Sequence, residues 1–262
     1  MCRKRVWREP LENHGEKPYR LINTGYEMKI AAIGDLHCTR DSSGEMYEIL
    51  SGVEEDADVL VLAGDLTNTG LVKEMEVLLE DLDRLALPKV AVTGNHDHES
   101  DQVELLTSMM RGRGIHVLDG TACEIGGVGF VGIKGFCGGF GRLRIQAFGE
   151  RALKTFIEWS INEAMSLEKA AMALDSAHKV GVLHYSPVKE TLRGEEPELY
   201  PFLGSSLLGE ALDRHGVDVM VHGHAHKGVP RGVTSRKTPV YNVARFVQKR
   251  FGTKSYFCFD VG

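Results

Sequence analysis

Short apolar runs that end abruptly in glycine or polar residues recur along the chain. Five of them are rich in β-branched residues and precede a polar cluster: Lys29–Ile33, Val59–Ala63, Val90–Thr93, Val180–Leu183 and Val217–Val221. Continuous apolar runs of this length are typical of strands buried on both faces. Helical stretches lie between them, at about 44–55, 70–86, 101–113 and 205–215. Strands that alternate with helices predict an α/β fold with a largely central sheet.

Two regions depart from this alternation. Residues 115–134 have the pattern of consecutive short strands joined by turns. The tail adds two more runs with strand character, Val240–Val243 and Ser255–Val261. A second sheet that contains antiparallel pairs would accommodate these segments.

The middle of the chain carries a different pattern. A glycine-rich loop occupies 135–142, and a long helix is predicted from about 146 to 173. We interpret 135–175 as an insertion in one compact domain that covers 28–262. The polar residues 1–27 are predicted to be an N-terminal extension, because no apolar stretch follows their basic residues.

Composition narrows the class of protein. The 262 residues are 42% apolar and 26% charged, as in ordinary globular domains, and the formal net charge is −6. This acidic balance disfavours a nucleic-acid partner, because such binders usually carry a basic excess. Five cysteines without CxxC spacing predict neither a disulfide framework nor a zinc ribbon, so we expect a reducing, cytoplasmic location. The sequence contains no apolar run of about 18 residues, so it predicts no membrane span. Nothing in it predicts the oligomeric state.

Polar residues that follow the predicted strands carry the candidate chemistry. They are Asp35, His37, Asp65, Asn95, His96, Asp97, His184, His222, His224 and His226. In open α/β sheets, ligands bind outside the carboxyl ends of the strands, so we expect these side chains at one sheet edge. Carboxylate, amide and imidazole groups suit divalent metals such as Mn, Fe, Zn, Co or Ni. Seven of these positions would serve two metal ions.

The spacing within the motifs suggests how an ion is held. On extended backbone, Asp35 and His37 would point to the same side and could chelate one ion. The same argument applies to His224 and His226. Asp65, at the end of a neighbouring strand, is expected to bridge two ions through its carboxylate.

Five motifs together resemble the calcineurin-like metallophosphoesterase family. They occur in the family's order, each after a predicted strand: Asp35-Leu36-His37, Gly64-Asp65, Gly94-Asn95-His96-Asp97, His184 and Gly223-His224-Ala225-His226. The resemblance implies a four-layer αββα sandwich with two mixed sheets. It also implies hydrolysis of a phosphate ester of a small molecule or nucleotide by metal-bound hydroxide, as a phosphodiesterase or a phosphatase.

The resemblance also implies roles for individual residues. The implied ligands of a first metal ion are Asp35, His37 and His226. The implied ligands of a second metal ion are Asn95, His184 and His224. Asp65 bridges both ions. His96 is not a ligand in this scheme; it lies beside the substrate phosphate and helps to protonate the leaving group.

One departure from the family narrows the expected activity. In its phosphoprotein phosphatases the second motif continues as GDxVDRG, whereas here Asn68 and Thr69 stand where Asp and Arg would be. That Asp orients the catalytic histidine and that Arg belongs to phosphate recognition. The pattern is therefore closer to bacterial-type phosphodiesterases and small-molecule phosphatases. The alternative is a non-catalytic scaffold on the same fold, although this chain lacks none of the expected ligands.

Other polar residues remain open on sequence alone. His222 either points into the sheet or reaches a metal, and Cys38 either packs or binds one. Asp97 either holds the catalytic histidine or caps the next helix. Arg142 and Arg144 either contact a substrate phosphate or flank a tight turn that needs glycine conformations. The long helix that follows is a lid, an oligomer interface or plain packing.

Overall fold

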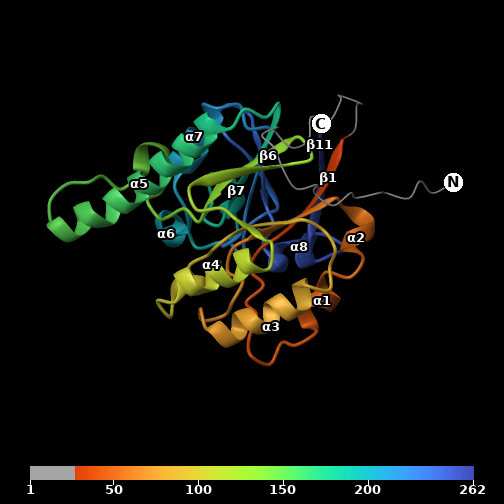
Figure 1. Cartoon of the computed structure of the whole chain (residues 1–262). Helices are drawn as coiled ribbons and strands as arrows, with labels where there is room; N and C mark the ends of the chain where they lie inside the picture. The colour runs from red at the N-terminus through yellow and green to blue at the C-terminus, as the bar shows by residue number, and fades with distance from the viewer. Residues whose placement is uncertain (1–26) are drawn as a thin grey trace, which may run out of the picture.

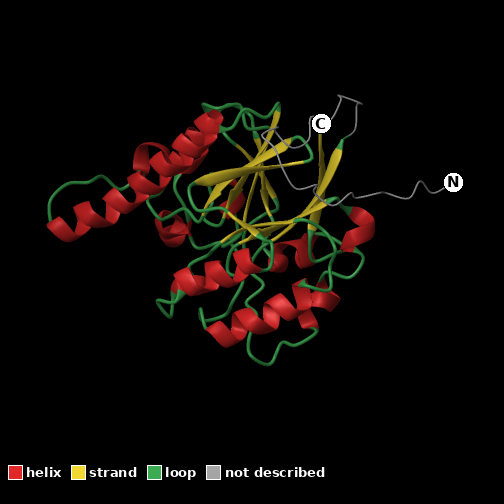
Figure 2. Cartoon of the chain, in the orientation of Figure 1, coloured by secondary structure: helices red, strands yellow, loops and turns green. Residues whose placement is uncertain are grey.

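The computed structural model describes residues 27–262, so all but Glu27 of the predicted N-terminal extension lies outside the described residues. Two β-sheets pack face to face, and helices cover both outer faces (Figures 1 and 2). The α/β class and the four-layer αββα sandwich with two mixed sheets are confirmed. Within 27–262, no helix is both long and apolar enough to cross a membrane.

The first sheet has the strand order β11-β1-β2-β3-β4. Its strands are β1 Met28–Ile33, β2 Val59–Ala63, β3 Lys89–Val92, β4 His116–Val117 and β11 Phe257–Val261. β1 to β4 run parallel, while β11 pairs antiparallel with β1. The parallel pairing brings the carboxyl ends of β1, β2 and β3 to one edge.

The second sheet has the strand order β5-β6-β7-β8-β10-β9. Its strands are β5 Thr121–Ile125, β6 Val128–Ile133, β7 His178–Leu183, β8 Val219–His222, β9 Arg231–Val233 and β10 Pro239–Asn242. β6, β7, β8 and β10 run parallel, and β5 and β9 are antiparallel edge strands. The strand segments expected at 115–134 and in the tail are therefore divided between the sheets. β5, β6 and β10 belong to the second sheet, as expected, whereas β4 and β11 belong to the first.

Helices form the outer layers. Four of them are α1 Glu45–Ile49, α2 Val53–Asp56, α3 Val72–Leu82 and α4 Val103–Gly112. Four more are α5 Arg151–Ala173, α6 Tyr200–Leu203, α7 Ser206–Asp213 and α8 Arg245–Phe251. Single 3-10 turns occupy His96–His98, Gly141–Leu143, Glu190–Leu192 and Pro197–Leu199.

The helices differ from the sequence prediction in three places. The helix expected at 44–55 is broken into α1 and α2, because Gly52 takes a left-handed φ of 82° between them. The long helix begins at Arg151 rather than 146. In the third place, the short helices α6 and α8 have no counterpart in the prediction. The proposed domain boundary and the insertion at 135–175 stay predictions.

Three apolar layers hold the four structural layers together. Along β1 and β2, successive side chains alternate between two of them: Ala31, Ile33 and Leu60 pack under α1, α3 and α4, whereas Ile30 and Val59 face the second sheet. A third cluster lies between the second sheet and the helices α5 and α7. This period-two alternation is what a strand buried on both faces requires.

Candidate metal centre

The motif loops begin where the parallel strands of both sheets end. The amide of Asp35 donates to the carbonyl of Gly64 at 2.9 Å, which joins the loop after β1 to the loop after β2. Glycine is required at Gly94, since an added Cβ would collide with the backbone nitrogen and carboxylate of Asp65. This close approach of backbones lets side chains distant in sequence converge on one point.

Backbone strain concentrates on the same loops. Among the described residues, six that are not glycine have positive φ, and four of them are predicted metal ligands: Asp35, His37, Asp65 and His224. Such conformations cost free energy and cluster at functional sites. The expectation that Asp35 and His37 lie on extended backbone is wrong, because their φ angles are 60° and 46°.

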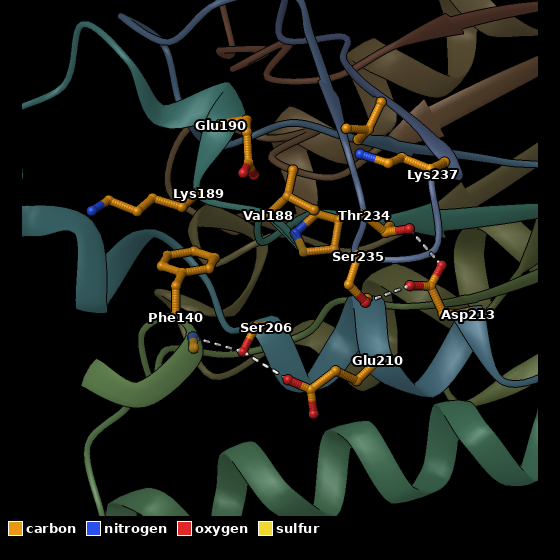
Figure 3. A pocket seen from close by; sticks show the side chains of 14 residues that line it. Phe140, Val188, Lys189, Glu190, Ser206, Glu210, Asp213, Thr234, Ser235 and Lys237 are labelled. Carbon is orange, nitrogen blue, oxygen red and sulfur yellow. Dashed lines mark hydrogen bonds between the residues drawn. The ribbon is translucent and has the colours of Figure 1, made fainter.

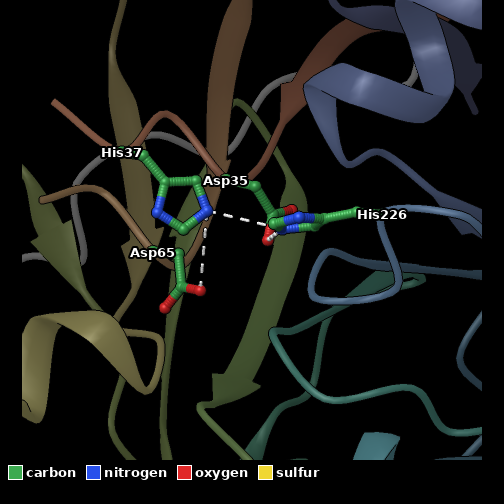
Figure 4. Close-up of side chains that lie close together, drawn as sticks. All are labelled: Asp35, His37, Asp65 and His226. Atoms are coloured by element: carbon green, nitrogen blue, oxygen red, sulfur yellow. Dashed lines mark hydrogen bonds and ion pairs between the residues drawn. The ribbon is translucent and has the colours of Figure 1, made fainter. Parts of the chain in front are cut away.

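The first group of candidate ligands consists of Asp35, His37, Asp65 and His226 (Figure 4). Each offers one ligand atom, and these atoms lie within 4.8 Å of one another. The Nε2 atom of His226 lies 2.9 Å from Oδ1 of Asp35 and 3.4 Å from Nε2 of His37. Imidazole nitrogens and carboxylate oxygens that point at one spot are the donor set of a divalent metal.

The second group consists of Asp65, His184 and His224, again within 4.8 Å. The Nε2 atom of His184 lies 3.3 Å from Oδ1 of Asp65 and 3.0 Å from Oδ1 of Asn95. Asp65 therefore belongs to both groups. His224 and His226 fall into different groups, so the expectation that this pair chelates one ion is wrong.

Backbone carbonyls orient two of the imidazoles. The Nδ1 atom of His184 lies 2.9 Å from the carbonyl oxygen of Ala63, and Nε2 of His224 lies 3.4 Å from that of Phe202. A ring nitrogen that donates to a carbonyl leaves the other nitrogen free as a ligand, and metal-binding histidines typically have such a partner. These contacts fit a metal site, and no motif in the sequence pointed to Phe202.

Charges within the two groups oppose one another. Burial lowers the pKa of His184, but the facing Asp65 carboxylate outweighs it and raises that pKa to about 9. Burial raises the pKa of Asp65, but His184 outweighs it and holds the pKa of this carboxyl below its usual range. Burial lowers the pKa of His37 to about 4. Burying the carboxylates of Asp35 and Asp65 costs free energy unless each charge is paired. The surrounding imidazoles can pair them when protonated, and a bound cation would do the same.

His96 lies beside both groups. Its backbone amide donates to Oδ1 of Asp65 at 2.8 Å, and its Nδ1 donates to the carbonyl of Asn68 at 2.7 Å. Its ring centroid is 4.6 Å from that of His37, and its side chain is 36% exposed. With Nδ1 held by a carbonyl, Nε2 is the nitrogen left for a ligand or a proton transfer.

The structure also places the residues that the sequence left open. Asp97 is buried and accepts hydrogen bonds from Leu66, Thr67 and Gly94, so it joins the loops after β2 and β3. His222, at the end of β8, is buried, and its Nε2 lies 2.9 Å from the hydroxyl of Thr191 in the 3-10 turn Glu190–Leu192.

Two further open residues are engaged elsewhere. Cys38 packs in the core under α1 and α3, where burial raises the pKa of its thiol to about 12. Arg144 donates to Glu210 of α7 at 2.8 Å, which ties the glycine-rich loop to that helix. Neither residue belongs to the two groups of candidate ligands.

A cavity of about 490 Å³ lies elsewhere, between the glycine-rich loop, α7 and the β9 hairpin (Figure 3). Two of its three acids are already engaged: Asp213 accepts from Thr234 at 2.6 Å and Glu210 from Arg144. Its lining contains none of the predicted site residues. The candidate chemistry is therefore at the motif loops and not in this cavity.

Solved structures share the fold. One crystal structure superposes with a TM-score of 0.62 at 15% identity, covering 90% of this chain and 95% of the other. The crystal structure of TT1561 of Thermus thermophilus gives a TM-score of 0.55 at 16% identity, covering 85% of this chain and 92% of that one. A Staphylococcus aureus protein proposed to be a 5′-nucleotidase, in complex with alpha-ketoglutarate, gives a TM-score of 0.50 at 15% identity. That match covers 83% of this chain and 48% of the other.

Sequence comparison identifies the family. A search of curated proteins found no match. The family model of calcineurin-like phosphoesterases, in contrast, matches residues 28–228, which include every motif residue described above. By this match the chain belongs to the calcineurin-like phosphoesterase family.

Proposed function

We propose that this protein hydrolyses a phosphate ester of a small molecule or nucleotide with two divalent metal ions. The observation that carries the proposal is the position of Asp65, whose carboxylate is shared by both groups of candidate ligands. A shared carboxylate between two imidazole-rich groups suits a pair of cations and is not needed for one. Membership of a phosphoesterase family supports the reaction class.

The proposed ligand assignment divides the site in two. Asp35, His37 and His226 would hold the first ion. His184 and His224 would hold the second ion, with the amide oxygen of Asn95, which lies 3.0 Å from Nε2 of His184. Mixed oxygen and nitrogen donors suit Mn, Fe, Zn, Co or Ni, among which the donor set does not choose.

In the proposed reaction, the backbone amide and the ring of His96 have separate roles beside the two cations. When bound, the two cations supply hydroxide from water near neutral pH and neutralise charge on the phosphate oxygens. The hydrogen bond from the His96 amide fixes the Asp65 carboxylate. The His96 ring, in its protonated form, would give a proton to the departing alkoxide from Nε2, a step that contributes about 10²–10⁴-fold.

The test is hydrolysis of bis(4-nitrophenyl) phosphate and 4-nitrophenyl phosphate by the metal-free chain after addition of each candidate ion. We expect turnover that depends on the ion and that falls in His96→Ala, by less for these good leaving groups than the factor of about 10²–10⁴ expected for alkyl esters. The matched control is His116→Ala, which removes an exposed histidine of β4 and should leave turnover unchanged. A chain that turns over no ester of a wider panel with any ion would instead be a non-catalytic scaffold on this fold.

A further inference from the structure

The first turn of α8 is fixed to the candidate metal centre through the backbone. The amide of Arg245 donates to the carbonyl of Gly34 at 3.0 Å, directly before Asp35 in the chain. The side-chain amide of Asn242 donates to the carbonyl of Ala225 at 2.8 Å, between the two histidines of the last motif. The start of α8 is thereby held against both loops that supply the first group of ligands.

Phe246 covers one side of that group. Its ring centroid is 4.6 Å from the ring of His226 and 6.1 Å from the ring of His37. The side chain is nevertheless 40% exposed, although a phenylalanine in a core would be buried. The ring therefore forms part of the rim of the candidate metal centre, where an arriving substrate would pass.

The Arg245 guanidinium lies against this rim without a side-chain hydrogen bond. Its carbon is 4.9 Å from the Phe246 ring centroid, and its charge interacts at longer range with the carboxylates of Asp35 and Glu45. Among residues 27–262 no side-chain hydrogen bond or ion pair engages this half-buried guanidinium. Arg144 and Arg214, in contrast, are paired with Glu210 and Glu168.

An unpaired guanidinium at such a place points to an anionic ligand. It has five N–H donors in a planar fork that matches phosphate oxygens, and stacking on an aromatic ring restricts its motion. A bound anion would supply the acceptor that no described side chain offers to this half-buried guanidinium. The loop after Asp65 offers no competing cation, since Asn68 and Thr69 follow there.

We propose that Arg245 anchors the substrate phosphate and that the preferred substrates are phosphate monoesters. The inference rests on the proposed function. A monoester dianion has three non-bridging oxygens and a diester monoanion has two, so only the monoester keeps an oxygen for an added donor once two are bound to cations. Its extra charge also strengthens the interaction with a guanidinium.

The experiment compares the manganese-loaded wild-type chain with Arg245→Met, Arg245→Lys and a matched control, Arg231→Met. Arg231 also lies over an aromatic ring, 5.7 Å from the centroid of Tyr241, but on the β9–β10 hairpin. Three quantities are measured: metal content, the affinity for inorganic phosphate by calorimetry, and kcat and KM for 4-nitrophenyl phosphate and bis(4-nitrophenyl) phosphate.

We expect Arg245→Met to keep its metal but to weaken phosphate binding and raise the monoester KM by about 10- to 100-fold. Its diester KM should change by less than about threefold, because the diester offers the guanidinium no free oxygen. Arg245→Lys should recover part of the phosphate affinity, because it keeps the charge but loses the fork. Arg231→Met should match the wild type in all three measurements.

Three results would overturn the inference: unchanged phosphate affinity in Arg245→Met, equal losses for the monoester and diester, or loss of metal. The two proposals fail separately. If Arg245→Met equals a wild type that hydrolyses esters, the anchor is refuted and the function stands. If the wild type hydrolyses no ester of the wider panel with any ion but Arg245→Met no longer binds phosphate, the anchor stands and the function is refuted.

Discussion

The two halves of the candidate metal centre differ in their access to solvent. His184, in the second half, is fully buried, and its Nδ1 is held by the carbonyl of Ala63. In the first half, the side chain of His226 is 38% exposed and that of His37 is 11% exposed. His184 is thus built into the interior, whereas His226 lies on the open side of the site, next to α8.

Their electrostatics differ for the same reason. Burial lowers the pKa of His184, but Asp65 raises it to about 9, so this imidazole is charged at neutral pH in the metal-free chain. Burial lowers the pKa of His37 to about 4, so this imidazole is neutral at that pH. Where no cation is bound, each half contains an imidazole–carboxylate pair, His184 with Asp65 and His226 with Asp35, but only in the first pair are both side chains buried.

The largest loss of metal affinity is expected on substitution of Asp65, which both halves share. Asp65→Asn removes the shared carboxylate charge, so both ions should bind at least about 100-fold more weakly, as expected when a ligand charge is lost from both sites. Metal analysis after gel filtration measures the content, and calorimetry measures the affinities. Two full sites in this variant would contradict the proposed bridge.

His96→Ala should affect turnover and not metal. The side chain belongs to neither group of ligand atoms, so metal content should equal that of the wild type. Loss of the proton donor should lower kcat by about 10²–10⁴-fold for substrates with poor leaving groups. The effect should shrink for 4-nitrophenyl esters, whose leaving group needs less protonation. Parallel loss of metal would show that His96 is a ligand.

His184→Gln and His226→Gln compare the two halves directly. Each variant should lose one ion. In the metal-free state both variants should be destabilised, because each leaves a buried carboxylate, Asp65 or Asp35, without its histidine. The loss should be larger in His184→Gln, about 3–5 kcal/mol, since both members of that pair are buried. It should be smaller in His226→Gln, because the His226 side chain is 38% exposed and water screens its charge. Thermal unfolding in a chelator tests this, and similar melting temperatures would refute the distinction between the halves.

Metal binding should also depend on pH. Because an imidazole must be neutral to bind metal, the ion of the second half should displace one proton from His184 at every pH below about 9. Its affinity should fall about tenfold per pH unit below that value. His37, with a pKa of about 4, should add no proton release near neutrality. Calorimetry in buffers of different ionisation enthalpy counts the protons, and zero release would contradict the prediction.

The pair of His184 and Asp65 should also make the stability of the metal-free chain depend on pH. The pKa of His184 is raised on folding, so the stability from this histidine is fully present below its unfolded value of about 6.5. That stability should be lost as pH rises through about 9. Denaturant unfolding in a chelator at pH 6 and pH 9 measures the change, and His184→Gln should abolish this part of it.

The sequence was sufficient where local pattern and burial agree. Continuous apolar runs predicted β2 at its observed bounds and the other buried strands within one or two residues. It missed β9 and α8, and it found β11 and the β4 segment but expected them in the second sheet, because short or edge elements owe their pairing to contacts with distant strands. The spacing argument for Asp35 and His37 failed because left-handed backbone, which tertiary contacts impose, replaces the extended geometry.

By itself, the sequence determined the sheet-and-helix order, the family and which polar residues follow the strands, since these depend on residue type and spacing along the chain. The tertiary structure decided which histidine joins which group, that Asp97 joins two motif loops, and that Arg245 stands unpaired beside Phe246. These are contacts between segments far apart in the chain. Their geometry follows from how two twisted sheets pack, which no local pattern encodes.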